Sequence, residues 1–150
     1  MELGIVIGAA LTCAVGGILP WINSEVVVVA AALIVPPTAL PVLVGGCALG
    51  QMSSKAGVYG VARWAPHLLP KRARALLEPA ERYRDRRRLL VGAVFLGSAV
   101  SLPPFYLVTL ASGLLRVPFV LFSLAGFCGT AARYSILVWA ACSLGAGPCQ

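Results

Sequence analysis

The stretch that decides the fold reads PWINSEVVVVAAALIVPP and covers residues 20–37. Its apolar part, residues 26–35, would reach only about half-way through a bilayer as a helix, at about 1.5 Å per residue. Prolines bound the stretch on both sides, and the carboxylate of Glu25 stands before the apolar part. Irregular backbone survives at membrane depth only where protein or a wet cavity satisfies its polar groups. We therefore predict a re-entrant segment within residues 21–40.

The composition of the whole chain excludes an ordinary soluble globular protein. Of the 150 residues, 59% are hydrophobic and only 11% are charged, whereas charged residues make up about a quarter of a soluble domain. The mean hydropathy is +0.91. A core formed by so short a chain could not hide this many apolar side chains from water. The composition therefore predicts an all-α integral membrane protein.

Three segments are long enough to cross a bilayer, namely residues 3–19, 41–64 and 119–144. A second half-length apolar piece, residues 107–115, follows a proline pair in the second half of the chain. We predict about three full transmembrane helices and two opposed re-entrant segments in one membrane domain.

The second half repeats the order of features in the first half. Each half has a proline break, a half-length apolar piece, another proline, a Gly-rich span and a cation inside that span. Internal repeats of this kind are common in transport folds. The order predicts an inverted repeat, with repeat 1 at about 20–64 and repeat 2 at about 89–144, joined by a basic segment at about 66–88.

The basic segment holds eight of the twelve Lys and Arg residues of the chain. The positive-inside rule places it in the cytoplasm, so the chain is expected to be a multi-pass protein of the cytoplasmic membrane. Counting from there, the first helix would run outward from a cytoplasmic N-terminus. Interleaved leucines predict amphipathic helices that lie on the membrane and bind anionic lipid headgroups. The basic residues are Lys71, Arg72, Arg74, Arg82, Arg84, Arg86, Arg87 and Arg88.

Four charged residues inside or at the edge of the predicted membrane segments are candidate site residues. Glu25 could be a first-turn carboxylate favoured by the helix dipole, or a membrane-depth acid that exchanges a proton during transport. Arg133, Arg116 and Lys55 are candidates for binding an anionic headgroup, because guanidinium and ammonium groups bind phosphate. Alternatively, Arg133 pairs with Glu25 or with backbone carbonyls, and Arg116 and Lys55 extend to the headgroup region.

Five motifs taken together resemble the DedA superfamily, also called SNARE-associated or VTT-domain proteins, and especially its short YqaA-like branch. The resemblance implies a small helical membrane protein with two opposed re-entrant segments and a role in lipid translocation. In that family, lipid translocation includes the recycling of polyprenyl phosphate carriers by some members and phospholipid scrambling by eukaryotic relatives. The motifs are Pro20-Trp-Ile-Asn-Ser-Glu25, Tyr59-x-x-x-Arg63, Ser101-Leu-Pro103-Pro, Gly113-Leu-Leu-Arg116-Val-Pro118 and Gly129-x-x-x-Arg133-Tyr134.

The chain departs from larger family members in the second re-entrant segment. Those relatives carry an Arg beside an aromatic residue there, whereas this chain has Gly97-Ser-Ala-Val-Ser101. If that Arg holds the substrate phosphate in relatives, the contact here would fall to Arg116, Arg133 or Lys55.

The resemblance implies a DedA-like transporter, a flippase or scramblase, that moves a lipid with an anionic headgroup, with Glu25 as the candidate residue for proton coupling. The alternatives are a membrane-organising protein without transport activity and an exporter of small solutes or ions. The sequence shows no Ser/His/Asp arrangement, metal-ligand set or phosphate-cradling loop, so we predict neither an enzyme nor a cofactor or metal. The expected partners are membrane lipids and a second copy of the chain, and not nucleic acid.

Overall fold

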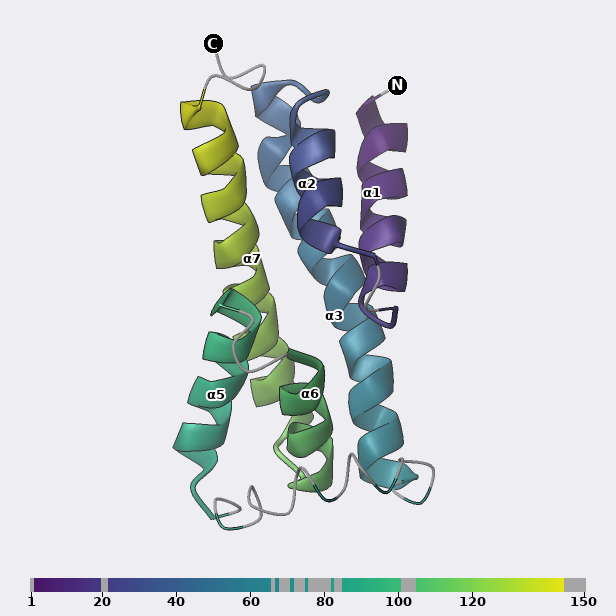
Figure 1. Cartoon of the computed structure of the whole chain (residues 1–150), viewed down its shortest axis with the longest axis vertical. Coiled ribbons are helices and arrows are strands. Elements are labelled where there is room, and N and C mark those ends of the chain that lie inside the picture. The colour runs from purple at the N-terminus through teal and green to yellow at the C-terminus, as the bar shows by residue number, and fades with distance from the viewer. Residues whose placement is uncertain are drawn as a thin grey trace. The chain divides into compact units, whose positions relative to one another are not determined.

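The computed structural model describes residues 2–19, 22–65, 67, 71, 75, 82, 85–100 and 105–144. All regular elements in these ranges are helices, as Figure 1 shows, so the predicted all-α class is confirmed for this part of the chain. They are α1 (Glu2–Gly16), α2 (Ser24–Ala32), the short 3-10 helix η1 (Pro37–Ala39), α3 (Leu40–Trp64), α5 (Arg87–Val100), α6 (Phe105–Leu114) and α7 (Phe119–Ser143).

Several predictions concern residues outside these ranges. They are the proline motifs at residues 20–21 and 101–104, the amphipathic helices of the basic segment, and the side chains of Arg72, Arg74 and Arg84.

Within the described ranges, α7 is the one helix both long and apolar enough to cross a membrane. Its 25 residues make it about 37 Å long, against about 30 Å for the hydrocarbon layer. Helix α3 has the same number of residues but carries Lys55 and Arg63. Helix α1 is apolar but has only 15 residues, because it ends at Gly16 and not near residue 19 as the hydropathy predicted.

The chain divides into two compact units. The first unit comprises Met1–Ser54 and Thr130–Gln150, and the second comprises Lys55–Gly129. Helices α3 and α7 therefore contribute residues to both units. In the first unit α1 packs against α2, and in the second unit α5 packs against α6. Each unit thus contains one helical hairpin together with parts of the two long helices.

In the first unit, α1 and the beginning of α3 pack closely and run in the same direction (Figure 1). A Cβ atom at Gly46 would lie 3.7 Å from the Cβ of Ala10, and one at Gly50 would collide with the Ala10 carbonyl. One turn further along both helices, the Ser54 hydroxyl donates a hydrogen bond to the Ala14 carbonyl. The charge distribution predicts that the first helix runs outward and that residues 41–64 run inward, and the parallel packing of α1 and α3 shows that this relative direction is wrong. The hydropathy predicts that residues 3–19 form a complete membrane crossing, whereas in the structure α1 packs against α2 in a hairpin.

The outward face of α1 carries large apolar side chains, and its packed face carries Val6 and smaller residues. Leu3, Ile7 and Leu11 are exposed at intervals of four residues, while Ala9 and Cys13 are buried. Close helix contact through small residues, with large apolar residues turned outward, is typical of helices that face lipid.

Glycines allow the same close contact in the second unit. A Cβ at Gly129 of α7 would lie 2.7 Å from the carbonyl oxygen of Phe95 in α5. A Cβ at Gly113 of α6 would lie 2.7 Å from the carbonyl oxygen of Tyr59 in α3. Any side chain at either position would push the neighbouring backbone away, so glycine is required by packing.

Candidate functional site

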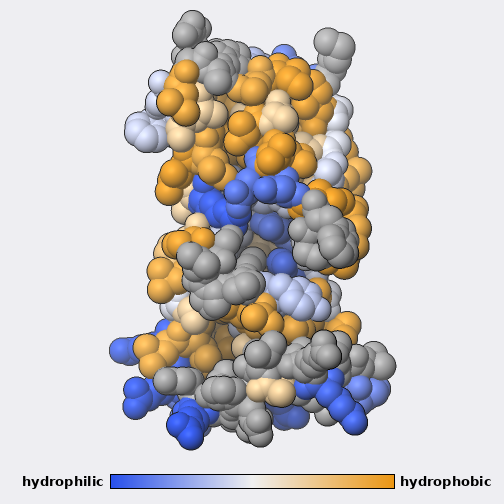
Figure 2. Space-filling model, viewed as in Figure 1, coloured by the Kyte–Doolittle hydropathy of each residue, from blue (hydrophilic) through white to orange (hydrophobic). Residues whose placement is uncertain are grey.

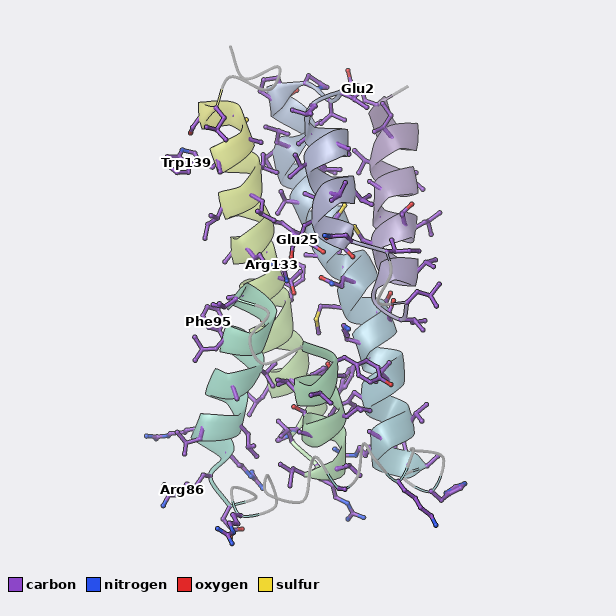
Figure 3. All side chains as sticks on the ribbon, viewed as in Figure 1. Glu2, Glu25, Arg86, Phe95, Arg133 and Trp139 are labelled. Atoms are coloured by element: carbon purple, nitrogen blue, oxygen red, sulfur yellow. The ribbon has the colours of Figure 1, made fainter. Side chains whose placement is uncertain are left out.

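The centre of the candidate site in the first unit is an ion pair between Glu25 and Arg133. The Asn23 side chain caps α2 by accepting a 3.0 Å hydrogen bond from the backbone N–H of Glu25, which fixes the carboxylate in the first helical turn. Figure 3 shows the two charged side chains pointing toward one another from α2 and α7. Their exposed fractions are 37% for Glu25 and 17% for Arg133, so both charges are half-buried. The pairing considered from the sequence is therefore present.

Polar side chains of α3 and α7 lie in the same unit as this pair, and of these the sequence singled out Tyr134 as part of a motif. The Tyr134 hydroxyl donates a 2.8 Å hydrogen bond to the side-chain oxygen of Gln51. The Thr130 hydroxyl, one turn before Tyr134 on α7, is buried and has no hydrogen-bond partner within the described structure. Figure 2 shows hydrophilic side chains at the place where Figure 3 labels Glu25 and Arg133, with a hydrophobic surface above them. Gln51 and Thr130 have no distinctive spacing, so only the packing identifies them.

Lys55 lies in the second unit and is only 6% exposed. Its ammonium nitrogen lies 5.7 Å from the ring centroid of Tyr106, the second residue of α6, which is within cation–π range. A side chain this deeply buried does not extend to the headgroup region. The structure therefore favours an inward-facing Lys55 over the alternative in which it snorkels outward.

Arg116 occupies the left-handed turn that ends α6, with φ at 54°. The N–H of Val117 donates to the Ser112 carbonyl at 3.0 Å, and the N–H of Arg116 donates to the Gly113 carbonyl at 3.2 Å. This is the Schellman motif, in which glycine normally takes the position of Arg116 because a left-handed residue with a side chain costs about 1–2 kcal/mol. A cation beside the last carbonyls of α6 offsets part of that cost.

The side chain of Arg116 is exposed and lines a cavity of about 260 Å³ together with Asp85 and Arg87. This placement agrees with the alternative in which Arg116 reaches lipid headgroups. The basic residues that the structure describes within the segment 66–88 are exposed as well, and Figure 3 labels one of them, Arg86. They are Lys71, Arg82, Arg86, Arg87 and Arg88.

A hydrogen-bonded clamp joins two of the five sequence motifs within the second unit. Arg63 donates to the Tyr59 hydroxyl at 2.6 Å, and that hydroxyl donates to the carbonyl of Val117. The ring of Tyr59 stacks on Phe122 with centroids 4.9 Å apart. The end of α3 is thereby fixed to the junction of α6 and α7. This role of Tyr59 and Arg63 could not be predicted from the sequence, because the carbonyl that they bind lies far away in the chain.

The cysteines differ from expectation at one position. Cys13, Cys47 and Cys128 are free thiols, whereas Cys142, in the last turn of α7, is disulfide-bonded. The five cysteines are scattered along the sequence with no spacing that suggests a disulfide framework, so the sequence predicts no disulfide, and for Cys142 this prediction is wrong. Spacing along the chain does not report which sulfur atoms meet in space.

No protein-family model, curated protein or solved structure matches this chain. Membership of the DedA superfamily therefore stays a prediction that rests on the five motifs. Of the candidate residues, the geometry pairs Glu25 with Arg133 in the first unit. In the second unit it places Lys55 against Tyr106, and Arg116 beside Arg87.

Proposed function

We propose that this chain is a DedA-like membrane protein that moves a lipid with an anionic headgroup, a polyprenyl phosphate or a phospholipid, across the cytoplasmic membrane. The observation that carries the proposal is the half-buried Glu25–Arg133 ion pair in a helical unit with an otherwise largely apolar surface. Ionisable side chains inside a membrane are expensive and commonly mark a substrate or proton pathway.

In the proposed topology, α3 and α7 cross the membrane in opposite directions and the two hairpins are re-entrant. The hairpin α1–α2 enters from the face at which α3 begins, because α1 runs parallel to α3. The hairpin α5–α6 enters from the face at which α7 begins. At about 1.5 Å per residue, the 15 residues of α1 cover about 22 Å and do not cross the hydrocarbon layer. This gives two full crossings, and not the three predicted from hydropathy.

Two independent features support the same sidedness. The basic segment between α3 and α7 is expected on the cytoplasmic side. The disulfide at Cys142 is expected on the opposite side, since disulfides persist in oxidising compartments. Both features support a C-terminal end of α7 outside the cytoplasm, and the parallel packing of α1 and α3 then supports a beginning of α1 on the same side.

In the proposed mechanism, the carboxylate of Glu25 and the lipid headgroup compete for the guanidinium of Arg133. When Glu25 takes up a proton it loses its charge, and its attraction for Arg133 falls. An anionic headgroup can then replace the carboxylate at the guanidinium, where a phosphate forms bidentate hydrogen bonds. When Glu25 releases the proton, its carboxylate competes again and the headgroup leaves.

The topology is tested with single-cysteine variants and a membrane-impermeant thiol reagent. Glu2→Cys should be labelled in intact cells, whereas Lys71→Cys should be labelled only after permeabilisation. Labelling of both positions only after permeabilisation would mean that α1 is a full crossing with a cytoplasmic start.

The function is tested by reconstitution into liposomes that contain a fluorescent anionic lipid and an entrapped dye. Wild-type protein should expose inner-leaflet lipid to an external quencher without releasing the dye. Glu25→Gln should stop or slow this exchange, while Glu2→Gln, a change of an exposed carboxylate at the start of α1, should not. Dye release would favour the small-solute exporter instead, and neither exchange nor release would favour a membrane-organising role.

A further inference from the structure

The second unit holds a cavity of about 490 Å³ between the end of α3 and the beginning of α7. Arg63 is the one charged side chain among its described lining residues, and the others are apolar or aromatic. The cavity therefore places a cation next to hydrocarbon and aromatic surface. The lining residues are Ala56, Tyr59, Arg63, Trp64, Pro118 and Phe119.

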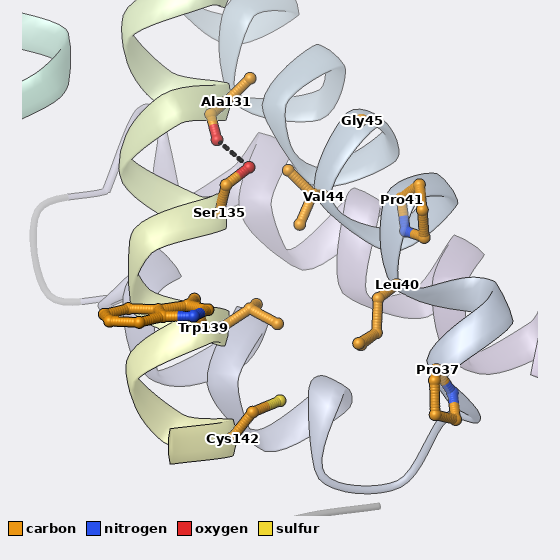
Figure 4. A pocket seen from close by; sticks show the side chains of 10 residues that line it. Pro37, Leu40, Pro41, Val44, Gly45, Ala131, Ser135, Trp139 and Cys142 are labelled. Atoms are coloured by element: carbon orange, nitrogen blue, oxygen red, sulfur yellow. Dashed lines mark hydrogen bonds between the residues drawn. The ribbon is translucent and has the colours of Figure 1, made fainter. Parts of the chain in front are cut away.

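A larger cavity, of about 660 Å³ in the first unit, differs in charge (Figure 4). Its walls include Leu40 and Val44 of α3 and Val138 and Trp139 of α7, and its described lining residues include no charged side chain. This uncharged cavity offers no group that would favour an anionic occupant.

The guanidinium of Arg63 is held in a fixed orientation by only one of its nitrogen atoms. Nη1 makes both of its hydrogen bonds, at 2.6 Å to the Tyr59 hydroxyl and at 3.4 Å to the Val117 carbonyl. The Cζ atom lies 5.9 Å from the ring centroid of Tyr59, which is within cation–π range. Nε and Nη2 make no hydrogen bond with the described residues. These two atoms form an edge of the guanidinium that can bind a phosphate in bidentate fashion.

The neighbours of Arg63 leave its charge without an anion. The side chain is half-buried, and in the described part of the chain no carboxylate forms an ion pair with it. The groups that bind it, a hydroxyl and a carbonyl, are neutral. Arg133, by contrast, is paired with Glu25. Since a partly buried cation is stabilised by an opposite charge, the cavity at Arg63 is complementary to an anionic ligand.

The aromatic walls favour an amphiphile over a small free anion. Trp64 lies back against α3, because a Cβ atom at Gly60 would be only 3.1 Å from its ring. Phe119 contacts Tyr59 with ring centroids 5.5 Å apart and is itself exposed. Tryptophan and tyrosine are enriched at membrane–water interfaces, where lipid phosphates lie next to the first methylene groups of the acyl chains. In the proposed topology, the end of α3 lies at the cytoplasmic interface.

We infer that this cavity binds an anionic glycerophospholipid, with its phosphate at Arg63 and the glycerol end of its acyl chains against Trp64 and Phe119. The inference rests on the membrane topology proposed above and not on lipid transport, and the unit concerned does not contain the Glu25–Arg133 pair. An acidic peptide fits less well, because its backbone N–H and C=O groups would find few hydrogen-bond partners on aromatic walls.

The probe is phosphatidic acid with brominated acyl chains, which quench tryptophan fluorescence, in phosphatidylcholine nanodiscs that hold the full-length protein. Two reporter proteins each keep one tryptophan, Trp64 or Trp139, with phenylalanine at the other two positions. Half-maximal quenching of Trp64 should need about tenfold less brominated phosphatidic acid than brominated phosphatidylcholine, the factor expected for one charged hydrogen-bonded pair. Trp139, in the uncharged cavity and similarly exposed, should show no such preference.

Two substitutions in the Trp64 reporter separate the cavity from the general charge of the protein. Arg63→Gln removes the cation, and Ala56→Leu places a larger side chain in the cavity without changing any charge, so each should abolish the tenfold preference. The matched controls are Arg86→Gln, at an exposed cation, and Gly45→Leu, which fills part of the uncharged cavity. Both controls should keep the preference. Thermal unfolding shows whether each variant is folded.

Three results would overturn the inference. Equal quenching of Trp64 by the two brominated lipids would mean that no anionic site lies beside it. A preference that persists in folded Arg63→Gln and Ala56→Leu proteins, or is equal at Trp139, would mean that anionic lipid gathers around the whole protein. Relief of quenching by excess soluble glycerol phosphate would mean that the cavity binds free phosphate and not lipid.

The same reporters separate this inference from the proposed transport. Preferential quenching of Trp64 that both substitutions abolish, in a protein that exchanges no lipid in liposomes, would support the binding site and refute transport. Lipid exchange without preferential quenching would do the reverse.

Discussion

The helices α1, α2 and α3 can be compared with α5, α6 and α7. The first set has 15, 9 and 25 residues, and the second has 14, 10 and 25. Gly50 is the eleventh residue of α3 and faces the carbonyl of Ala10, the ninth residue of α1. Gly129 is the eleventh residue of α7 and faces the carbonyl of Phe95, the ninth residue of α5. These correspondences favour a duplicated unit of three helices that starts at α1, earlier than the predicted start near residue 20.

The two sets differ in the charges that they bring together. The second residue of α2 is Glu25, which pairs with Arg133 of α7, whereas the second residue of α6 is Tyr106, which lies against Lys55 of α3. In each case the cation comes from the long helix of the other set. The shared glycines set the packing distance, and the unshared residues decide whether the cation meets an anion or an aromatic ring.

The largest expected effect is on stability, and it comes from disrupting the glycine contacts that the two sets of helices share. Gly50→Val and Gly129→Val should each lower the free energy of unfolding by about 2–4 kcal/mol, because the new side chain collides with a backbone carbonyl. Thermal unfolding of the purified protein in detergent measures the loss. Gly8→Val, at a position with open space, is the control. A lower free energy of unfolding in only one of the two glycine variants would argue against a packing arrangement shared by the two sets of helices.

The next effect tests the difference between the two cations. Arg133→Ala should slow lipid exchange by about tenfold to a hundredfold, since it removes a charged hydrogen-bonding group. It should also cost about 1–2 kcal/mol of stability, a modest figure because the pair is partly exposed. Lys55→Met should slow exchange less than Arg133→Ala does. If Lys55→Met has the larger effect on exchange in folded protein, the headgroup site belongs to the second unit.

A third test compares the two partners of the cations. Glu25→Gln should preserve expression and abolish lipid exchange or its pH dependence, because an amide keeps the size of the side chain but cannot carry the proton. Tyr106→Phe keeps the aromatic face beside Lys55 and should leave the pH profile unchanged. Exchange rates in liposomes across a pH series measure both variants. A Glu25→Gln protein with the wild-type profile would show that the carboxylate has only a helix-end role.

The smallest effect concerns the ends of the short helices. Helix α2 ends at Leu33 with right-handed backbone, φ at −72°, whereas α6 ends at the left-handed Arg116. Arg116→Gly should raise the free energy of unfolding by about 0.5–1 kcal/mol by removing backbone strain. Arg116→Ala keeps the strain and should not stabilise. Both should weaken binding to anionic vesicles equally, as a sedimentation assay would show, and unequal binding would mean that the turn geometry itself matters.

The sequence by itself determined the helical class and the position of the short helices. Prolines and half-length apolar pieces at residues 26–35 and 107–115 predicted them, and α2 and α6 begin about two residues earlier. At α2 the reason is the Asn23 cap, a local hydrogen bond. The exposed basic residues from Lys71 onward also follow from composition alone. These features depend on neighbouring residues, so they can be read along the chain.

Only the tertiary structure decided the direction of α1, the partner of Arg133 and the disulfide at Cys142. Many apolar faces in this sequence are similar enough to pack against one another, and hydropathy does not rank them. The choice is made by small contacts at long range, such as Gly50 against Ala10 and Ser54 against Ala14, which fix α1 parallel to α3. The pairing of charges follows from that packing. A buried charge without a partner costs free energy, so each charge pairs with the group that the helix packing places near it.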